Sequence, residues 1–488
     1  MVIDKAELRW FYAIILAFLA VSIFFLAKEM YWVAAFPLVL GIAYLAVFSI
    51  DTLLFIVAFC TPVAIVLNDK TSGPALSIPT EPLMFGITLL FIFKFIFEGG
   101  FDKRILWHPV SLAIFFHITW MLITSMTSSM PLVSFKHLMS QLWFIIPFYF
   151  LGTQLFRKKE NIRKFVWLYA ITLAVVILYT IFNHAQNGWT QKAAHWVMTP
   201  FYNDHTAYAA VIALFIPIIF AFTRNREASF PERVFAILML TLFLTALILS
   251  YTRAAWLSLV IAITVYFIYK FKIRFYTVAA VSGAILVLFF SFQTEIMMKL
   301  EKNRQDSATD FNKHLQSISN ISTDASNLER INRWNCAMRM FDQRPFLGWG
   351  PGTYQFNYAP FQKSNEMTII STNAGDMGNA HSEFIGPLAE EGVLGMVAMI
   401  LIVIAVIYRA TMFYSISSDK QNKILLLGIL LGLVTYFVHG TLNNFLDTDK
   451  LSVPVWAFIA MIVALDVYHS NSVEDEASPR NGKKKLLH

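Results

Sequence analysis

The chain has 488 residues, of which 57% are apolar and only 14% are charged, and its formal net charge is +7. This composition excludes an ordinary soluble domain. Crossing about 30 Å of hydrocarbon takes about 20 apolar residues per helix, and apolar runs recur along most of the chain. We therefore expect an all-α polytopic membrane protein, because the strands of a membrane barrel would alternate in runs of about 10 residues.

The apolar runs predict about 12–14 transmembrane helices, about eleven of them within residues 1–292 and the rest within 384–468. The first run lacks a small-residue cleavage site and is followed by Lys28 and Glu29, so we interpret it as a retained span. A charged tail, 469–488, ends the chain. The candidate spans lie near residues 10–27, 31–48, 50–67, 83–98, 109–126, 135–155, 165–182, 206–223, 233–249, 254–270, 275–292, 384–408, 424–440 and 452–468.

Lysine and arginine in the loops predict the orientation of the chain. If the N-terminus lies inside, the inner loops and tails hold basic clusters such as Arg157-Lys158-Lys159 and Lys483-Lys484-Lys485. Cytoplasmic loops carry this excess of positive charge, so we expect both termini in the cytoplasm and a large loop outside it. The net charge would then face anionic lipid headgroups rather than nucleic acid. The short outer loops would hold only Lys28, Lys70, Lys136, Lys192, Arg253 and Lys450.

Residues 293–383 form the one large outer loop, and its second half is expected to contain an amphipathic helix. Ser326–Glu329 has the pattern of a capping box, and Pro345 would end the helix. Arg330 would border its apolar stripe, whereas Arg333 would lie further round. Such a helix should lie along the membrane surface or pack on the bundle. The stripe consists of Ile331, Trp334, Met338 and Phe341.

Arg253 opens a predicted span as the only basic residue in a tight outer turn. As an ordinary membrane residue it would anchor the helix at the interface. As a functional residue it would bind an anion, because a guanidinium holds phosphate oxygens in a planar fork. The cost of placing an arginine between two apolar helices favours the second interpretation.

His381 precedes the span at 384–408 and is followed by Glu383, Glu390 and Glu391. A lone histidine at an interface is usually a polar cap. A histidine beside carboxylates can instead be held in one tautomer and act as a base near neutral pH. Carboxylates that enter a span need cations or backbone donors as partners.

Other outer polar residues, including His205 and His439, are candidates for the walls of the same site. No His/Cys cluster has zinc spacing. The glycine-rich run 345–352 lacks the Lys-Ser/Thr ending of a phosphate loop. We therefore expect neither a metal nor a cofactor. Cys60 lies in a span and Cys336 in the outer loop, so we expect no disulfide between them.

Three motifs, in this order, resemble those of the bacterial O-antigen ligase/polymerase superfamily. The three motifs extend over residues 250–395. The chain departs from the family pattern at Ser382 and, ahead of these motifs, at His205, where asparagine is common. The motifs are Ser250-Tyr-Thr-Arg253-Ala-Ala-Trp256, then Arg330-Ile-Asn-Arg333-Trp334 with Pro345-x-x-Gly348-x-Gly350-x-Gly352, then Asn379-Ala-His381-Ser-Glu-Phe384 with Leu388-Ala-Glu-Glu391-Gly392-x-x-Gly395.

The resemblance implies a glycosyltransferase of the bacterial inner membrane that works on the periplasmic side. Its donor would be a glycan on undecaprenyl diphosphate. The family's arginines at positions matching Arg253 and Arg330 would bind the diphosphate, and His381 would act on the acceptor. We expect a metal-independent, inverting reaction. The residues expected to contact substrate are Arg333, His205, Glu383, Glu391 and His439.

Several functions fit this reading, and the favoured one is ligation of O-antigen, or a related surface polysaccharide, to lipid A–core. A polymerase would add the glycan to another lipid-linked repeat, and a protein O-oligosaccharyltransferase would use a serine or threonine. A flippase or transporter of lipid-linked oligosaccharide is the alternative from another class. Transporters place their charges near the bilayer midplane, whereas here they gather at outer helix ends.

Overall fold

The computed structural model describes residues 48–67, 76–225, 228–292, 325–368, 371 and 378–470, together with scattered positions between 12 and 45. Within these residues ten helices are long and apolar enough to cross a membrane. The prediction of an all-α polytopic membrane protein is therefore confirmed. The expected span at 10–27 lies partly outside the described residues and the one at 31–48 largely outside them, as do most of the expected tail and the first part of the long loop.

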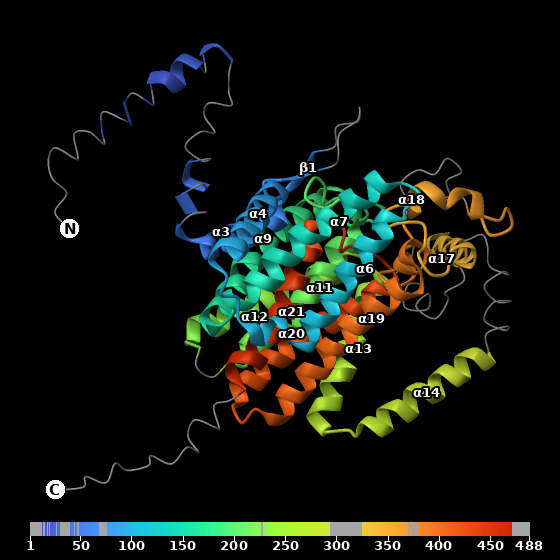
Figure 1. The fold of residues 1–488 in the computed structure, drawn as a ribbon. Helices are drawn as coiled ribbons and strands as arrows, with labels where there is room; N and C mark the ends of the chain where they lie inside the picture. The colour runs from blue at the N-terminus through green and yellow to red at the C-terminus, as the bar shows by residue number, and fades with distance from the viewer. Residues whose placement is uncertain are drawn as a thin grey trace, which may run out of the picture. The chain divides into compact units, whose positions relative to one another are not determined.

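The spans follow one another along the chain and pack as a bundle (Figure 1). One of them is a continuous run of three pieces, α7 (Pro131–Ile145), a π-helical stretch (Ile146–Leu151) and α8 (Gly152–Leu155). The other spans are α4 (Thr80–Glu98), α6 (Pro109–Met126), α9 (Lys159–Gln186), α11 (His205–Thr223), α12 (Phe230–Leu249), α13 (Arg253–Phe271), α19 (Ile385–Ile416), α20 (Lys420–Gly440) and α21 (Asp449–His469).

Shorter elements connect the spans or flank them. Two of these lie in the long loop, namely α17 (Ala325–Gln343) and α18 (Tyr354–Asn357). The others are α3 (Ile50–Cys60), two 3₁₀ turns (Thr61–Val63 and Ala359–Phe361), β1 (Ile65–Leu67), β2 (Leu76–Ile78), α5 (Lys103–Leu106), α10 (Gln191–Ala194) and α14 (Phe275–Ser291).

The expected span at 50–67 is wrong as a single helix. α3 ends at Cys60 and Pro62 lies in the 3₁₀ turn, because proline has no N–H to continue a helix. β1 then pairs antiparallel with β2, with Ile65 opposite Ile78. The buried Lys450 ammonium donates to the carbonyl oxygens of Thr61 (2.6 Å) and Ala64 (2.7 Å), which ties this break to the start of α21.

α21 forms the centre of the bundle, and every side chain from Asp449 to Asp466 is buried. A helix that is apolar nearly all round belongs inside a large protein. α11 and α20 pack closely beside it. A Cβ on Gly432 would lie 2.5 Å from the carbonyl oxygen of Leu214, so the two backbones need the glycine to approach this closely.

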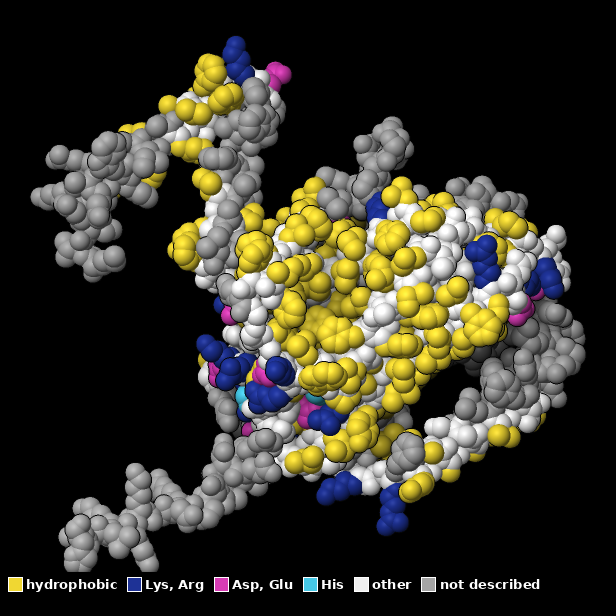
Figure 2. Space-filling view, in the orientation of Figure 1, with side chains coloured by type: hydrophobic (Ala, Val, Ile, Leu, Met, Phe, Trp, Pro, Cys, Tyr) yellow, Lys and Arg dark blue, Asp and Glu magenta, His cyan; other side chains and the backbone are white. Residues whose placement is uncertain are grey.

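The outward faces of the bundle are apolar. Figure 2 shows hydrophobic side chains over the middle of one face, with lysine and arginine gathered below them. Leu238 of α12 and Val260 of α13 are among the exposed apolar residues. A surface of this kind suits contact with lipid tails, with the basic residues at the water boundary.

α17 forms as expected and packs on α19. Its buried apolar residues Cys336, Ala337 and Met340 cluster with Ala389 of α19. The predicted stripe is only partly covered: Ile331, Trp334 and Phe341 are half-buried, and Met338 is 46% exposed. Both cysteines are free thiols.

Candidate functional site

Five segments meet at one end of the bundle, called the site end below. Thr252 donates to the carbonyl oxygen of His205 (3.5 Å), which joins the starts of α13 and α11. The Arg330 Nε donates to the carbonyl oxygen of Leu442 (3.1 Å), joining α17 to the loop after α20. The backbone N–H of Glu383 donates to the carbonyl oxygen of Gly440 (2.8 Å). The site end therefore holds residues singled out from the sequence, namely Arg253, Arg330, His381, His205 and His439.

His381 lies in an unusual backbone conformation, with φ of +50°. Residues other than glycine and asparagine seldom adopt it. Asn379 accepts a hydrogen bond from the His381 N–H (3.1 Å), and the Ser382 hydroxyl accepts from the first N–H groups of α19. Ser382 thus accepts from N–H groups at the entry to the helix, as asparagine also can. These contacts fix the backbone of His381 just ahead of the span.

Two arginines of α17 act electrostatically on His381. Burial lowers the pKa of His381, the charges of Arg330 and Arg333 lower it further, and the result is about 4. Asp204 and Glu329 act in the opposite direction, more weakly. The imidazole is therefore neutral at pH 7 and can accept a proton.

His439, at the end of α20, is buried beside Arg330, Asp204 and His205, and both of its ring nitrogens lack a hydrogen-bond partner in the described part of the chain. The Nδ2 of Asn443 is in the same state. Buried polar atoms without partners are costly. These atoms are therefore suited to a polar ligand at this end of the bundle.

Helix starts add positive potential to the same end. α11 begins at His205, α13 at Arg253 and α19 at Ile385, and the N-terminus of a helix favours anions. The His205 ring stacks on His195 with centroids 4.2 Å apart, and its Nδ1 lies 3.2 Å from a carboxylate oxygen of Asp204.

Arg333 is largely occupied by the protein itself. Its Nε lies 2.7 Å from a carboxylate oxygen of Glu329, and its guanidinium carbon lies 4.0 Å from the ring centroid of Tyr358. A Cβ on Gly378 would collide with the same guanidinium, so glycine is needed there. Arg333 is thus a buried positive charge that acts on His381 from within the protein.

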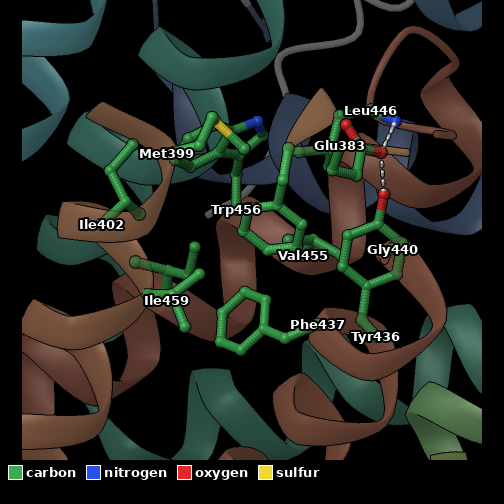
Figure 3. Close-up of a pocket in the computed structure, with 12 residues that line it drawn as sticks. Glu383, Met399, Ile402, Tyr436, Phe437, Gly440, Leu446, Val455, Trp456 and Ile459 are labelled. Carbon is green, nitrogen blue, oxygen red and sulfur yellow. Dashed lines mark hydrogen bonds between the residues drawn. The ribbon is translucent and has the colours of Figure 1, made fainter. Parts of the chain in front are cut away.

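Glu383 holds the loop that carries the Arg330 contacts. One carboxylate oxygen accepts hydrogen bonds from the Tyr436 hydroxyl (2.5 Å) and from the backbone N–H groups of Phe445 (2.7 Å) and Leu446 (3.0 Å), the first and last of which Figure 3 shows. Burial first, and then the charge of Asp447, raises the pKa of Glu383 to about 7.

The glycine-rich run docks on a break in α19. Gly392 interrupts the helix with φ of +73°, and a Cβ there would lie 2.2 Å from the carbonyl oxygen of Phe346. Glu390 accepts hydrogen bonds from the N–H groups of Gly352 (2.9 Å) and Tyr354 (2.7 Å). The carboxylate thus has backbone donors as partners, whereas the neighbouring Glu391 has one oxygen without a partner within the described residues.

Sequence reasoning missed one part of this end. The sequence analysis names no site residue in the first six predicted spans, yet α4, α6 and α7 line a cavity of about 560 Å³ next to residues 379–383. His117, Lys136 and Gln141 were the available signals, because polar residues inside apolar helices need a reason.

Comparison with known proteins agrees with the motifs. Residues 237–400 match the O-antigen ligase (Wzy_C) family, and this range contains Arg253, Arg330 and His381. An uncharacterized protein of Haemophilus influenzae is 21% identical over 238 residues, which are 48% of this chain and 57% of that protein. The chain thus spans little more than half the length of that relative. From this match and the geometry of the site end, residues 237–400 are a domain of the O-antigen ligase family.

Proposed function

We propose that the chain transfers a glycan from undecaprenyl diphosphate to an acceptor hydroxyl, most simply as the ligase that joins a surface polysaccharide to lipid A–core. The observation that carries the proposal is the meeting of Arg330 and a neutral His381 beside three helix N-termini, with Arg333 as a further buried positive charge nearby. Cations and helix N-termini favour a diphosphate, and a neutral imidazole can take a proton.

In the proposed step, the acceptor oxygen bonds to the anomeric carbon while the bond from that carbon to the diphosphate oxygen breaks. Arg253 and Arg330 offset the negative charge that the leaving diphosphate gains. His381 takes the proton from the attacking hydroxyl. The bound diphosphate would also raise the pKa of His381, because its negative charge opposes that of the arginines.

The site is proposed to face the periplasm, with both chain ends in the cytoplasm. The basic loops Arg157-Lys158-Lys159 and Lys270–Arg274 support this orientation, because they follow the helix ends opposite to the site end. A cysteine introduced at exposed Ser364 should react with a membrane-impermeant thiol reagent added to intact spheroplasts. Labelling only after lysis would contradict the orientation.

The decisive experiment incubates purified protein in vesicles with a lipid-diphosphate glycan and each candidate acceptor. Arg330→Gln should reduce transfer by about 10²–10³-fold, since it removes one charge stabiliser. Arg339→Gln is the matched control, because Arg339 lies on the same helix but pairs with Glu366. Equal rates in the two variants would remove Arg330 from the mechanism.

The product distinguishes the alternatives. Glycosylated lipid A–core indicates a ligase, a longer lipid-linked glycan indicates a polymerase, and a glycosylated protein indicates an oligosaccharyltransferase. Movement of the donor across the vesicle without any product would indicate a flippase. Transfer should persist in the presence of EDTA and in the absence of ATP. A strict need for a divalent metal ion or for ATP would contradict the proposed step.

A further inference from the structure

A second polar region lies beside the site just described, and the proposed transfer step does not use it. It is the cavity of about 560 Å³ between α4, α6, α7, the start of α19 and the loop after α20. Segment 379–383 separates it from the arginines. Asn379, Ala380 and Ser382 line the cavity, whereas Arg253, Arg330 and His439 do not.

Several residues that line this cavity have a buried polar atom without a partner. Leaving each of them unsatisfied costs about 1–3 kcal/mol. The indole N–H groups can only donate, and the carboxylate and amide oxygens can only accept. An occupant with hydroxyl groups, which both accept and donate hydrogen bonds, suits this set of side chains. In the described part of the chain, the unpartnered atoms of its lining residues are His117 Nδ1, Trp143 Nε1, Glu391 Oε2, Asn444 Oδ1 and Trp456 Nε1.

The side chains of the walls favour an uncharged occupant over the diphosphate. Lys136 is the only lysine or arginine among the described lining residues, and it lies on the exposed side of α7. The lining carboxyl groups outnumber it, so an anion would be repelled. They belong to Glu81, Glu383, Glu390, Glu391 and Asp447.

Aromatic side chains complete the lining. Trp143, Tyr354, Phe356 and Trp456 present rings to the cavity region. Ligand pockets combine such apolar surfaces with a few placed polar groups. A pyranose ring matches this combination, because it has C–H faces for the rings and hydroxyl groups for the polar atoms.

We propose that this cavity binds an uncharged sugar unit of the acceptor, and that segment 379–383 is the wall it shares with the diphosphate site. That the bound sugar belongs to the acceptor rests on the proposed function. Binding of the ring here would present the attacking hydroxyl at the edge of the wall, toward His381. Trp143 and Glu391 then act as sugar-binding residues.

Direct binding tests the cavity without activity. Full-length protein in detergent is mixed with neutral methyl glycosides, and saturation transfer to the sugar is measured by NMR. Ser140→Phe places a ring in the cavity and should weaken binding about tenfold or more. Met139→Phe is the control, because Met139 is 44% exposed on the same helix. The inference is overturned if no glycoside binds the wild type, or if Ser140→Phe binds equally well.

A second pair of variants removes polarity rather than space. Trp143→Phe keeps an aromatic ring but deletes the unpartnered N–H, and should also weaken glycoside binding. Trp167→Phe is the control, because Trp167 packs against Phe222 and Phe235 away from the cavity. Equal effects of the two substitutions would remove Trp143 from the sugar site.

Two further readouts separate this inference from the proposed function. In the vesicle assay Ser140→Phe should raise KM for the acceptor about tenfold and leave KM for the donor unchanged. A change in the donor KM alone would contradict the role of the cavity in binding the acceptor. Arg253→Ala should lose binding of inorganic pyrophosphate and keep glycoside binding. If Arg253→Ala still binds pyrophosphate, the proposed diphosphate site fails while the sugar cavity stands.

Discussion

Replacing Glu383 by glutamine tests the energetics of the loop that positions Arg330. Burial, followed by the charge of Asp447, raises the pKa of Glu383 from 4.5 to about 7, and a rise of that size is worth about 3 kcal/mol. Because the folded-state pKa lies above the unfolded value, the folded protein binds an extra proton between about pH 4.5 and 7. The free energy of unfolding should therefore fall as the pH rises through that window.

Glutamine can accept the same hydrogen bonds through its carbonyl oxygen but does not ionise. Glu383→Gln should remove this pH dependence and, at about pH 8, unfold with a free energy up to about 3 kcal/mol higher than the wild type. Glu383→Ala should instead be less stable at every pH. It leaves the Tyr436 hydroxyl and the N–H groups of Phe445 and Leu446 without an acceptor, at about 1–3 kcal/mol for each group.

The assay is denaturant unfolding in detergent micelles between about pH 5 and 8. Glu160→Gln, an exposed position at the start of α9, is the control for the substitution itself. Glu383→Gln should also still bind pyrophosphate, because the loop that accepts from Arg330 stays in place. The reasoning is refuted if wild type and Glu383→Gln lose stability equally as the pH rises.

The remaining predictions concern the base, its neighbour and the helix break. His381→Asn should lose about 10²–10⁴-fold in transfer rate while keeping its unfolding midpoint, because asparagine tolerates the positive φ; a large loss of stability would show that the defect is structural. Arg330→Met should move the acid limb of the pH profile of kcat/KM to higher pH, because the charge of Arg330 lowers the pKa of His381; an unmoved limb would exclude His381 as the titrating group. Gly392→Ala should prevent folding, since the added Cβ would lie 2.2 Å from the carbonyl oxygen of Phe346, whereas Gly86→Ala, with open space around it, should fold normally. Yields on gel filtration compare the two glycine variants.

Hydropathy, loop charge and ordered motifs are local properties of the chain, so what they indicate can be predicted from the sequence. Apolar runs long enough to cross a membrane predicted the spans of the described bundle, because backbone N–H and C=O groups in lipid must form their hydrogen bonds within a helix. They failed at residues 50–67, where Pro62 divides an apolar run into a short helix and a hairpin. Nothing in this apolar run indicates that Lys450, far along the chain, donates hydrogen bonds to its backbone at the break.

The sequence singled out the residues that meet at the site end, but not the separate contacts that each of them makes. Arg330 and Arg333 belong to one motif but have different partners. Arg330 donates to the loop after α20, whereas Arg333 pairs with Glu329 and stacks on Tyr358. Glu383, which the sequence suggests as a substrate-contacting residue, accepts hydrogen bonds from the backbone of that loop. Side-chain partners depend on how distant segments pack, which spacing along one segment does not encode.

The cavity lined by α6 and α7 is the clearest case of a feature that only the tertiary structure decides. Each of these helices alone reads as an apolar span with a few polar residues. Only when the start of α19 and the loop after α20 pack against them do His117, Trp143 and Glu391 line one cavity. Sequence determines which segments enter the membrane, since that depends on the local cost of desolvation. Packing determines which polar groups meet there, since that depends on contacts between residues hundreds of positions apart.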